Sequence, residues 1–278
     1  MLKKPITMRK GIRFFIVGLS PLFFTTVFAD EPVTKEVEYA SISIIIDDMG
    51  YHNKSGRRAI SLPGQLTYSF LPHSPYANQL SKLANDSRKE VMLHLPMEAE
   101  NGSKLGPGGL TQAMSEENFI KVLENNIEAI PYARGFNNHM GSLLTKSQLW
   151  MRKLMREVAT DKNLFFVDSK TTSQSVALSA AQAEGLQSIS RDIFIDHEMS
   201  RGFIQQQLKK LIKQAKLKGT ALAIAHPKKL TLSILEKWLP HLEEKGIKLV
   251  SVSKLISLKQ QRKLALWKAP GKNLISKH

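Results

Sequence analysis

The amino-acid sequence predicts an α/β fold: an irregular (β/α) barrel of seven to eight mainly parallel strands with helices outside. Short apolar segments alternate with helix-forming segments from about residue 41 to residue 252. The first apolar segment, residues 41–46, is uncharged and rich in isoleucine, which is typical of a strand buried on both faces of a parallel sheet. Alternation of this kind places helices outside a parallel sheet, either closed into a barrel or left open, and we expect the barrel.

Residues 1–29 have the composition of a secretory signal peptide. Five basic residues precede an apolar run over residues 14–28, and Ala29 ends a small-residue cleavage site. An uncleaved membrane anchor is the alternative, but the run is short for a span and contains Pro21. We therefore expect an exported protein, periplasmic or secreted, with no stable membrane insertion after cleavage and with a linker over residues 30–40.

Charge and cysteine content restrict the chemistry and the partners. The chain has no cysteine, so disulfides and thiolate ligands are excluded and any metal must be held by His, Asp or Glu. The formal charge of +16 falls by five, to +11, when the signal is removed. In a cell envelope this charge favours anionic polymers and lipid head groups as partners and not nucleic acid. Many basic residues follow Lys248, and we expect residues 259–278 to form a frayed, solvated tail rather than a specific binding arm.

The barrel domain is expected over residues 41–258. Its predicted strands lie near residues 41–47, 66–71, 90–95, 133–137, 164–168, 193–196, 220–225 and 247–252.

Helical patterns lie between these strands. Ser115 begins one with two acidic residues in its first turn, and Pro131 ends it. A second pattern covers residues 147–161. Two more, over residues 201–218 and 231–245, each end at a glycine suited to a helix C-cap.

Titratable side chains follow almost every predicted strand. In chain order they are Asp47 and Asp48, His73, His94, His139, Asp168, Asp196 with His197, and His226. The carboxyl ends of parallel barrel strands share one rim, so these residues are expected to converge there. A catalytic zinc-type centre without cysteine needs such a set: three His or carboxylate ligands, and further groups that orient them.

Each candidate also has a structural interpretation. The two aspartates could cap the next helix, and His94, between two leucines, could be a hydrogen-bonded core histidine. His73, between two prolines, could shape a substrate site or cap a turn. His139, beside two asparagines and a glycine, and His226, directly after an apolar strand, are harder to explain structurally.

Several short runs together resemble the divergent polysaccharide deacetylases, a distant branch of the carbohydrate esterases that remove acetyl groups from glycans. The matching runs are residues 44–50 (IIIDDMG), 90–98 (EVMLHLPME), 137–142 (NNHMGS), 165–168 (FFVD) and 225–227 (AHP). Each run is weak alone, but the set spans nearly the whole mature domain. The resemblance implies a distorted β/α barrel that acts on a cell-envelope polysaccharide.

The resemblance also implies roles for individual residues. Asp47 would be the catalytic base, His226 the general acid, and Asp168 the residue that orients His226 or a ligand. Asp48 and His94 would hold a divalent metal, with zinc the first choice. The position four residues after His94, where the main deacetylases have a second histidine, is Glu98 here. Either Glu98 or His139 would then be the third ligand, and we favour His139. We expect His73, Asn138 and Glu98 to contact substrate.

Two other functions remain open at this point. The same fold with a vestigial site would make a non-catalytic glycan-binding protein. A metal-dependent phosphoesterase also uses Asp and His at strand ends, but it usually needs more carboxylates to hold two metals than gather here.

Overall fold

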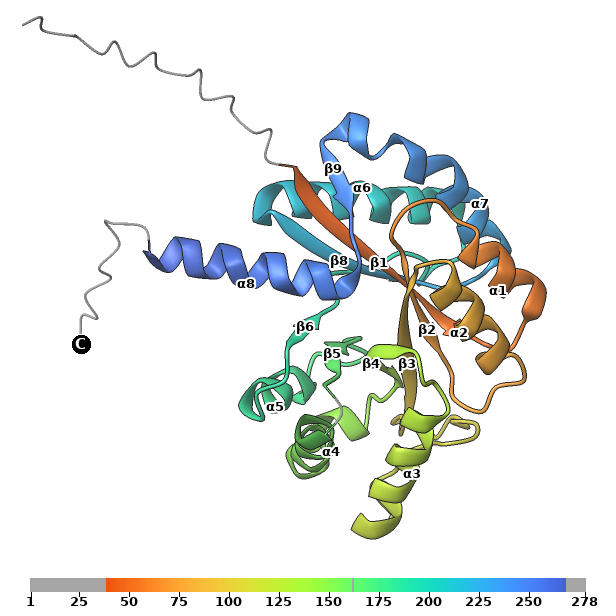
Figure 1. Cartoon of the computed structure of the whole chain (residues 1–278), viewed down its shortest axis with the longest axis vertical. Helices are drawn as coiled ribbons and strands as arrows, with labels where there is room; N and C mark the ends of the chain where they lie inside the picture. The colour runs from red at the N-terminus through yellow and green to blue at the C-terminus, as the bar shows by residue number, and fades with distance from the viewer. Residues whose placement is uncertain (1–38, 162, 269–278) are drawn as a thin grey trace, which may run out of the picture. The chain divides into compact units, whose positions relative to one another are not determined.

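A single parallel sheet forms the centre of the protein. In a computed structural model of the chain, residues 39–161 and 163–268 are described, and nine strands in them belong to this sheet (Figure 1). The strands are β1 (Ala40–Met49), β2 (Thr67–Phe70), β3 (Glu90–Met97), β4 (Ala133–Met140), β5 (Phe165–Asp168), β6 (Ser188–Ser190), β7 (Ile193–Phe194), β8 (Thr220–Ala225) and β9 (Ile247–Leu249).

The strand order is β6-β5-β4-β3-β2-β1-β8-β7, and β9 pairs with the first residues of β1. Every pairing among these strands is parallel. Within the described residues the path stays open between β6 and β7, so the sheet is a curled, incomplete barrel. The predicted α/β fold with an irregular, mainly parallel barrel is confirmed.

Helices surround the sheet, and all but the last of them cover its outer face. They are α1 (Asn53–Ile60), α2 (Ala77–Asp86), α3 (Glu116–Glu128), α4 (Gln148–Asp161), α5 (Ala177–Ala183), α6 (Arg201–Lys218), α7 (Lys229–Trp238) and α8 (Val252–Lys268), with 3₁₀ turns at Leu144–Lys146, Leu239–His241 and Glu243–Lys245. Helices α6, α7, α1 and α2 pack side by side, and so do α3, α4 and α5.

The predicted helix ends are mostly correct. The Ser115 side chain accepts a hydrogen bond from the backbone N–H of Asn118, as expected of an N-cap. Gly219 and Gly246 adopt the left-handed conformation with φ of 80° and 70°. The single helix expected over residues 231–245 is wrong: α7 ends at Trp238, and two 3₁₀ turns follow, the first containing Pro240.

Strand residues alternate between two cores. Ile42, Ile44 and Ile46 of β1 lie in the larger core, which the sheet shares with the outer helices. Ile45 points the other way, into a smaller core inside the curl that also contains Met92 of β3. By the same two-residue period, inward-facing side chains nearer the carboxyl ends of the strands lie above that smaller core.

Helix α8 closes the amino end of the curl. Its residues Val252, Leu255 and Ile256 belong to the inner core, and Glu90 on β3 accepts hydrogen bonds from the first backbone N–H groups of the helix. We expected a frayed tail from residue 259, but α8 continues to Lys268, so residues 259–268 are helical.

The ends of the chain lie outside the described residues. These include the predicted signal peptide, nearly all of the predicted linker, and residues 269–278 of the predicted tail. Among the described helices, none combines the length and apolarity needed to cross a membrane.

Candidate metal centre

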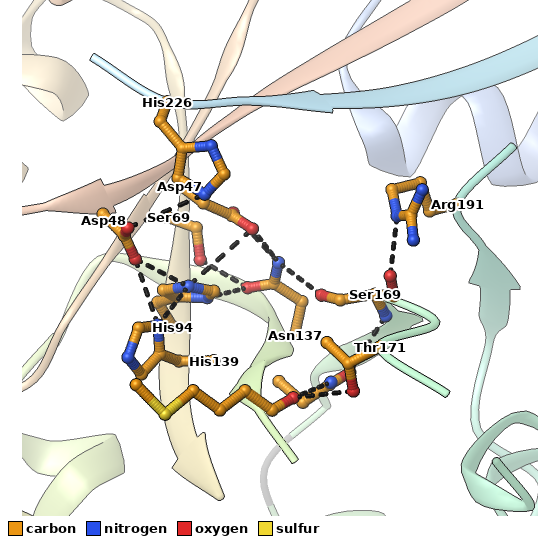
Figure 2. A network of polar contacts seen from close by, with 12 residues as sticks. Asp47, Asp48, Ser69, His94, Asn137, His139, Ser169, Thr171, Arg191 and His226 are labelled. Carbon is orange, nitrogen blue, oxygen red and sulfur yellow. Dashed lines mark hydrogen bonds and ion pairs between the residues drawn. The ribbon is translucent and has the colours of Figure 1, made fainter. Parts of the chain in front are cut away.

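Three potential ligand atoms meet at the carboxyl end of the sheet. The Oδ1 atom of Asp48 lies 3.2 Å from Nε2 of His94 and 3.1 Å from Nδ1 of His139. The two imidazole nitrogens are 3.2 Å apart. Figure 2 shows the three side chains, from β1, β3 and β4, pointing toward one another. The atoms form an almost equilateral triangle.

This triangle fits a divalent metal. Asp48 Oδ1 is buried and has no hydrogen-bond partner, an arrangement that is costly unless another group satisfies the oxygen. In a tetrahedral zinc centre with ligand distances of about 2.0–2.1 Å, neighbouring ligand atoms are about 3.3–3.4 Å apart, close to the separations found here. One carboxylate and two imidazoles are also ligands that zinc accepts. The predicted set of Asp48, His94 and His139 is therefore brought together.

The backbone after β1 directs Asp48 toward this position. The pairing of β1 with β2 shifts register between Ile46 and Met49, and Asp48 has a φ of 54°. A non-glycine residue in the left-handed region is uncommon and strained, and such residues cluster at functional sites. Gly50, with a φ of 118°, then turns the chain closely past Ser74. This backbone conformation directs the Asp48 carboxylate toward both histidines.

Asp47, the residue before Asp48, lies on the inner face of β1, two residues after Ile45. It is only 2% exposed, and both of its oxygens accept hydrogen bonds from Nδ2 of Asn137, at 2.9 and 3.0 Å. Its Oδ2 is 3.8 Å from Nε2 of His94. Burial raises the pKa of Asp47, even though His94, His226 and Asn137 partly oppose this effect. A raised pKa makes the Asp47 carboxylate a better proton acceptor.

The ligand residues influence one another's ionisation. Burial raises the pKa of Asp48, but the His139 and His94 imidazoles outweigh it and hold that pKa below its usual range. Burial lowers the pKa of His94, but the carboxylates of Asp47 and Asp48 outweigh it and raise the pKa to about 9. Without a metal, the site thus favours a positive charge on His94.

His226 approaches from β8 on the other side of Asp48. Its Nε2 is 3.6 Å from Asp48 Oδ2, and its Nδ1 is 2.9 Å from Oδ1 of Asp196. The second oxygen of Asp196 accepts from the His226 backbone N–H and from the Thr231 hydroxyl. Burial lowers the pKa of His226, but Asp196 outweighs it, so the pKa is raised.

The structure corrects the expected role of Asp168. Its carboxylate accepts hydrogen bonds from the backbone N–H of Lys170 and from the Ser175 hydroxyl, so it shapes the loop after β5. Asp196 has the place beside His226 that was assigned to Asp168, because β7 is the neighbour of β8 whereas β5 is not.

Asn138 and Glu98 have structural partners. Asn138 is 1% exposed, and its amide donates to the Met140 carbonyl and accepts from the Ser169 backbone N–H, so protein encloses the side chain. These contacts give Asn138 a structural role, and its contact with substrate stays a prediction. The Glu98 carboxylate accepts from the Gln112 backbone N–H and lies outside the ligand cluster, so His139 and not Glu98 stands beside His94. A substrate contact of Glu98 stays a prediction.

His73 follows β2, as expected, but contacts helix α3. Its Nε2 lies 3.1 Å from Oδ1 of the buried Asn126, whose amide donates to the Gly108 carbonyl. Its φ of 57° places it in the left-handed region. A substrate contact of His73 also stays a prediction.

Sequence reasoning missed two residues of the site. Asp196 was noted only as a strand end, and Asn137 only as part of the setting of His139. The signal that identifies Asn137 is its position two residues before His139, which places both side chains on the inner face of β4. Asp196 has no such signal in the sequence, because its contact with His226 depends on β7 being the neighbour of β8 in the sheet.

Comparisons with known proteins identify the family of the chain. The model of the divergent polysaccharide deacetylase family matches residues 44–256. An uncharacterized protein of Haemophilus influenzae is 32% identical over 250 residues, covering 90% of this chain and 85% of that protein.

Solved structures show a similar fold. An uncharacterized protein from Agrobacterium tumefaciens C58 has a TM-score of 0.75 at 23% identity, covering 78% of this chain and 89% of that chain. A CE4 family pseudoenzyme of Bacillus anthracis, as a variant with restored enzymatic activity, has a TM-score of 0.50 at 16% identity, covering 78% of this chain and 68% of that chain.

Proposed function

The chain belongs to the divergent polysaccharide deacetylase family, and from this membership we propose that it is a metal-dependent hydrolase that removes acetyl groups from a cell-envelope polysaccharide. The observation that carries the proposal is the buried, unpartnered oxygen of Asp48 at 3.1–3.2 Å from two imidazole nitrogens. A buried Asp and a carboxylate-paired His lie on either side of it.

Asp48, His94 and His139 would hold the metal, for which zinc is the first choice. When bound, a divalent ion supplies Lewis acidity that polarises an acetyl carbonyl and lowers the pKa of water from ~15.7 toward ~7. The absence of cysteine limits the ligands to these residue types.

Asp47 would act as the general base. Its Oδ atoms lie beside the ligand triangle, and its raised pKa suits a group that accepts a proton from the attacking water. Asn137 occupies the other side of the carboxylate, so the orientation of Asp47 is fixed before substrate arrives.

His226 would act as the general acid. Asp196 accepts a hydrogen bond from Nδ1–H and leaves Nε2 directed toward the site, where it would give a proton to the departing sugar nitrogen or oxygen. General acid–base groups of this kind typically contribute ~10²–10⁴-fold to the rate. Asp196 also favours the protonated imidazole that this role requires.

The envelope substrate and the export of the protein rest on the sequence. The basic mature chain suits an anionic polymer, and the first 29 residues have the pattern of a signal peptide.

A non-catalytic glycan-binding protein is the second candidate. It is favoured by Glu98 at the position where the main deacetylases have a histidine, and the similar fold with a TM-score of 0.50 is that of a CE4 family pseudoenzyme.

The two candidates are separated by acetate release. The mature chain would be reconstituted with zinc and incubated with a panel of acetylated glycans, beside His139→Ala as a metal-site control. Acetate release that is lost in the variant supports the deacetylase. Zinc binding and glycan binding without acetate release would support the binding protein, and release of phosphate from a phosphate ester instead of acetate would support a phosphoesterase.

A further inference from the structure

We propose that Asn137 is a positioning residue that connects the base to a metal ligand: its one side-chain amide orients the Asp47 carboxylate and fixes the imidazole tautomer of His94. The roles of base and ligand rest on the proposed function, but the hydrogen-bond argument does not. Figure 2 shows the Asn137 amide beside the ligand triangle, joined by dashed lines to both Asp47 and His94.

All hydrogen-bonding positions of this amide are used. Nδ2 donates to both oxygens of Asp47, at 2.9 and 3.0 Å, and to the Ser169 hydroxyl at 3.1 Å. Oδ1 accepts from the Ser69 hydroxyl at 2.6 Å and lies 2.9 Å from Nδ1 of His94. An amide offers two N–H donors and two acceptor lone pairs, so none remains free. Asn137 is fully buried, and water cannot substitute for any of these partners.

The Asp47 carboxylate determines which way the amide faces. An ionised carboxylate only accepts hydrogen bonds, so the NH₂ group of Asn137 must point toward it. The carbonyl oxygen then faces His94, which must donate from Nδ1. With its proton on Nδ1, a neutral His94 presents the Nε2 lone pair to Asp48 and His139, which is the tautomer that a metal ligand needs.

The backbone makes this arrangement rigid. His94 and Asn137 are register partners on the parallel strands β3 and β4, and Asn137 is in turn the partner of Val167 on β5. Both side chains point into the curl above the apolar inner core. The amide is therefore held by a central strand and not by a loop, which gives the positional precision that a ligand and a base both require.

The test compares two replacements of Asn137. Asn137→Ala removes the partner of His94, and an orienting partner of this kind is worth about 10–100-fold in metal affinity. Asn137→Asp keeps an acceptor for His94 Nδ1 but places a second carboxylate against Asp47. Ser69→Ala removes a different bond to the same oxygen and is the matched control. Asn138→Ala, at the equally buried neighbouring asparagine, controls for damage to β4.

Zinc affinity would be measured by competition with a chelator, and acetate release on the same preparations. We expect Asn137→Ala to lose about 10–100-fold in zinc affinity, while Asn137→Asp binds zinc at least as tightly as the wild type and still loses turnover. This opposite movement of affinity and turnover is not expected of a residue that only packs. Ser69→Ala and Asn138→Ala should bind zinc within about threefold of the wild type, because the His94–Asn137 contact remains.

Two results would overturn the proposal: wild-type zinc affinity in Asn137→Ala, or equally weak affinity in Asn137→Ala and Asn137→Asp. If the wild type binds zinc but releases no acetate, the proposed function fails, and the zinc affinities alone decide the role of Asn137.

Discussion

The Nδ1 atom of His226 lies 2.9 Å from Oδ1 of Asp196. This contact joins the end of β8 to the residues after β7, and the Thr231 hydroxyl holds the second Asp196 oxygen. The imidazole is thus fixed with Nε2 toward Asp48, 3.6 Å from its Oδ2. A carboxylate that orients an imidazole and stabilises its charged form is the arrangement that a general-acid histidine needs.

Replacement of this carboxylate should weaken proton donation. In Asp196→Asn, we expect turnover to fall about 10–100-fold, because part of the general-acid contribution of ~10²–10⁴ is lost. Asp196 raises the pKa of His226, so its removal should lower that pKa and move the high-pH limb of the turnover profile to lower pH. A pH profile of acetate release measures both effects, and an unshifted high-pH limb would contradict the assignment.

Asp168→Asn is the matched control for this prediction. Its carboxylate accepts hydrogen bonds from the Lys170 backbone N–H and the Ser175 hydroxyl, which both belong to the loop after β5. We expect turnover within about threefold of the wild type and a modest loss of stability, about 1 kcal/mol, from the weakened loop contacts. Turnover lost as severely as in Asp196→Asn would restore Asp168 to the catalytic set.

The third ligand can be decided by zinc binding alone. His139→Ala should lose stoichiometric zinc, because Nδ1 is one of three atoms at the ligand position. Glu98→Gln should retain it, since the Glu98 side chain contacts the Gln112 backbone outside the cluster. Zinc content of the two dialysed proteins, measured by atomic emission, distinguishes them. Zinc lost in Glu98→Gln and kept in His139→Ala would reverse the choice.

Zinc affinity should depend on pH through His94. Without metal the pKa of His94 is raised to about 9, and zinc binds only the neutral imidazole. Affinity should therefore fall about tenfold for each pH unit below that value, or about 100-fold between pH 8 and pH 6. Zinc affinities measured at pH 6, 7 and 8 test this, and equal values would contradict it.

The raised pKa of His94 affects the stability of the metal-free protein in the opposite direction: stability should fall as pH rises, whereas zinc affinity falls as pH is lowered. A raised pKa in the folded state means that the contribution of His94 to stability is complete below about pH 6.5 and is lost as pH rises through about 9.

The turn after Asp48 should tolerate no side chain. Alanine at Gly50 would adopt a φ of 118° and place its Cβ 2.0 Å from the Ser74 hydroxyl, which is buried and bonded to the Leu71 carbonyl. We expect Gly50→Ala to lower the free energy of unfolding by about 1–3 kcal/mol. Gly185→Ala, with a φ of 81° and open space around it, isolates the cost of the backbone conformation. Equal losses in urea unfolding would show that the Ser74 contact is unimportant.

The sequence predicts long strands and amphipathic helices well in this protein. The strands β1, β3 and β8 each contain a run of apolar residues, and α3 and α6 have clear caps. Helices α1, α2, α5 and α8 and strand β6 were not predicted. NKSGRRAI has only Ala59 and Ile60 as apolar side chains, and α5 and β6 are only seven and three residues long. Such short elements depend on tertiary packing more than on local pattern.

The three proposed ligands could be predicted from the sequence, whereas the hydrogen-bond partner of His226 could not. Asp48, His94 and His139 each follow or end a strand, and parallel strands bring those ends together. The pairing of His226 with Asp196 instead of Asp168 depends on strand order. In the sheet, β8 lies between β1 and β7, and β5 is separated from it by four strands. That order is not encoded in any local pattern around either aspartate.

The most direct test of the account is acetate release by zinc-loaded Asp47→Asn beside the wild type, with zinc content measured on the same samples. Asp47 lies next to the ligand triangle but is not part of it, so the variant should keep its zinc. Without the base, turnover should fall by about 10²–10⁴-fold. Undiminished acetate release from zinc-replete Asp47→Asn would contradict the mechanism at its first step.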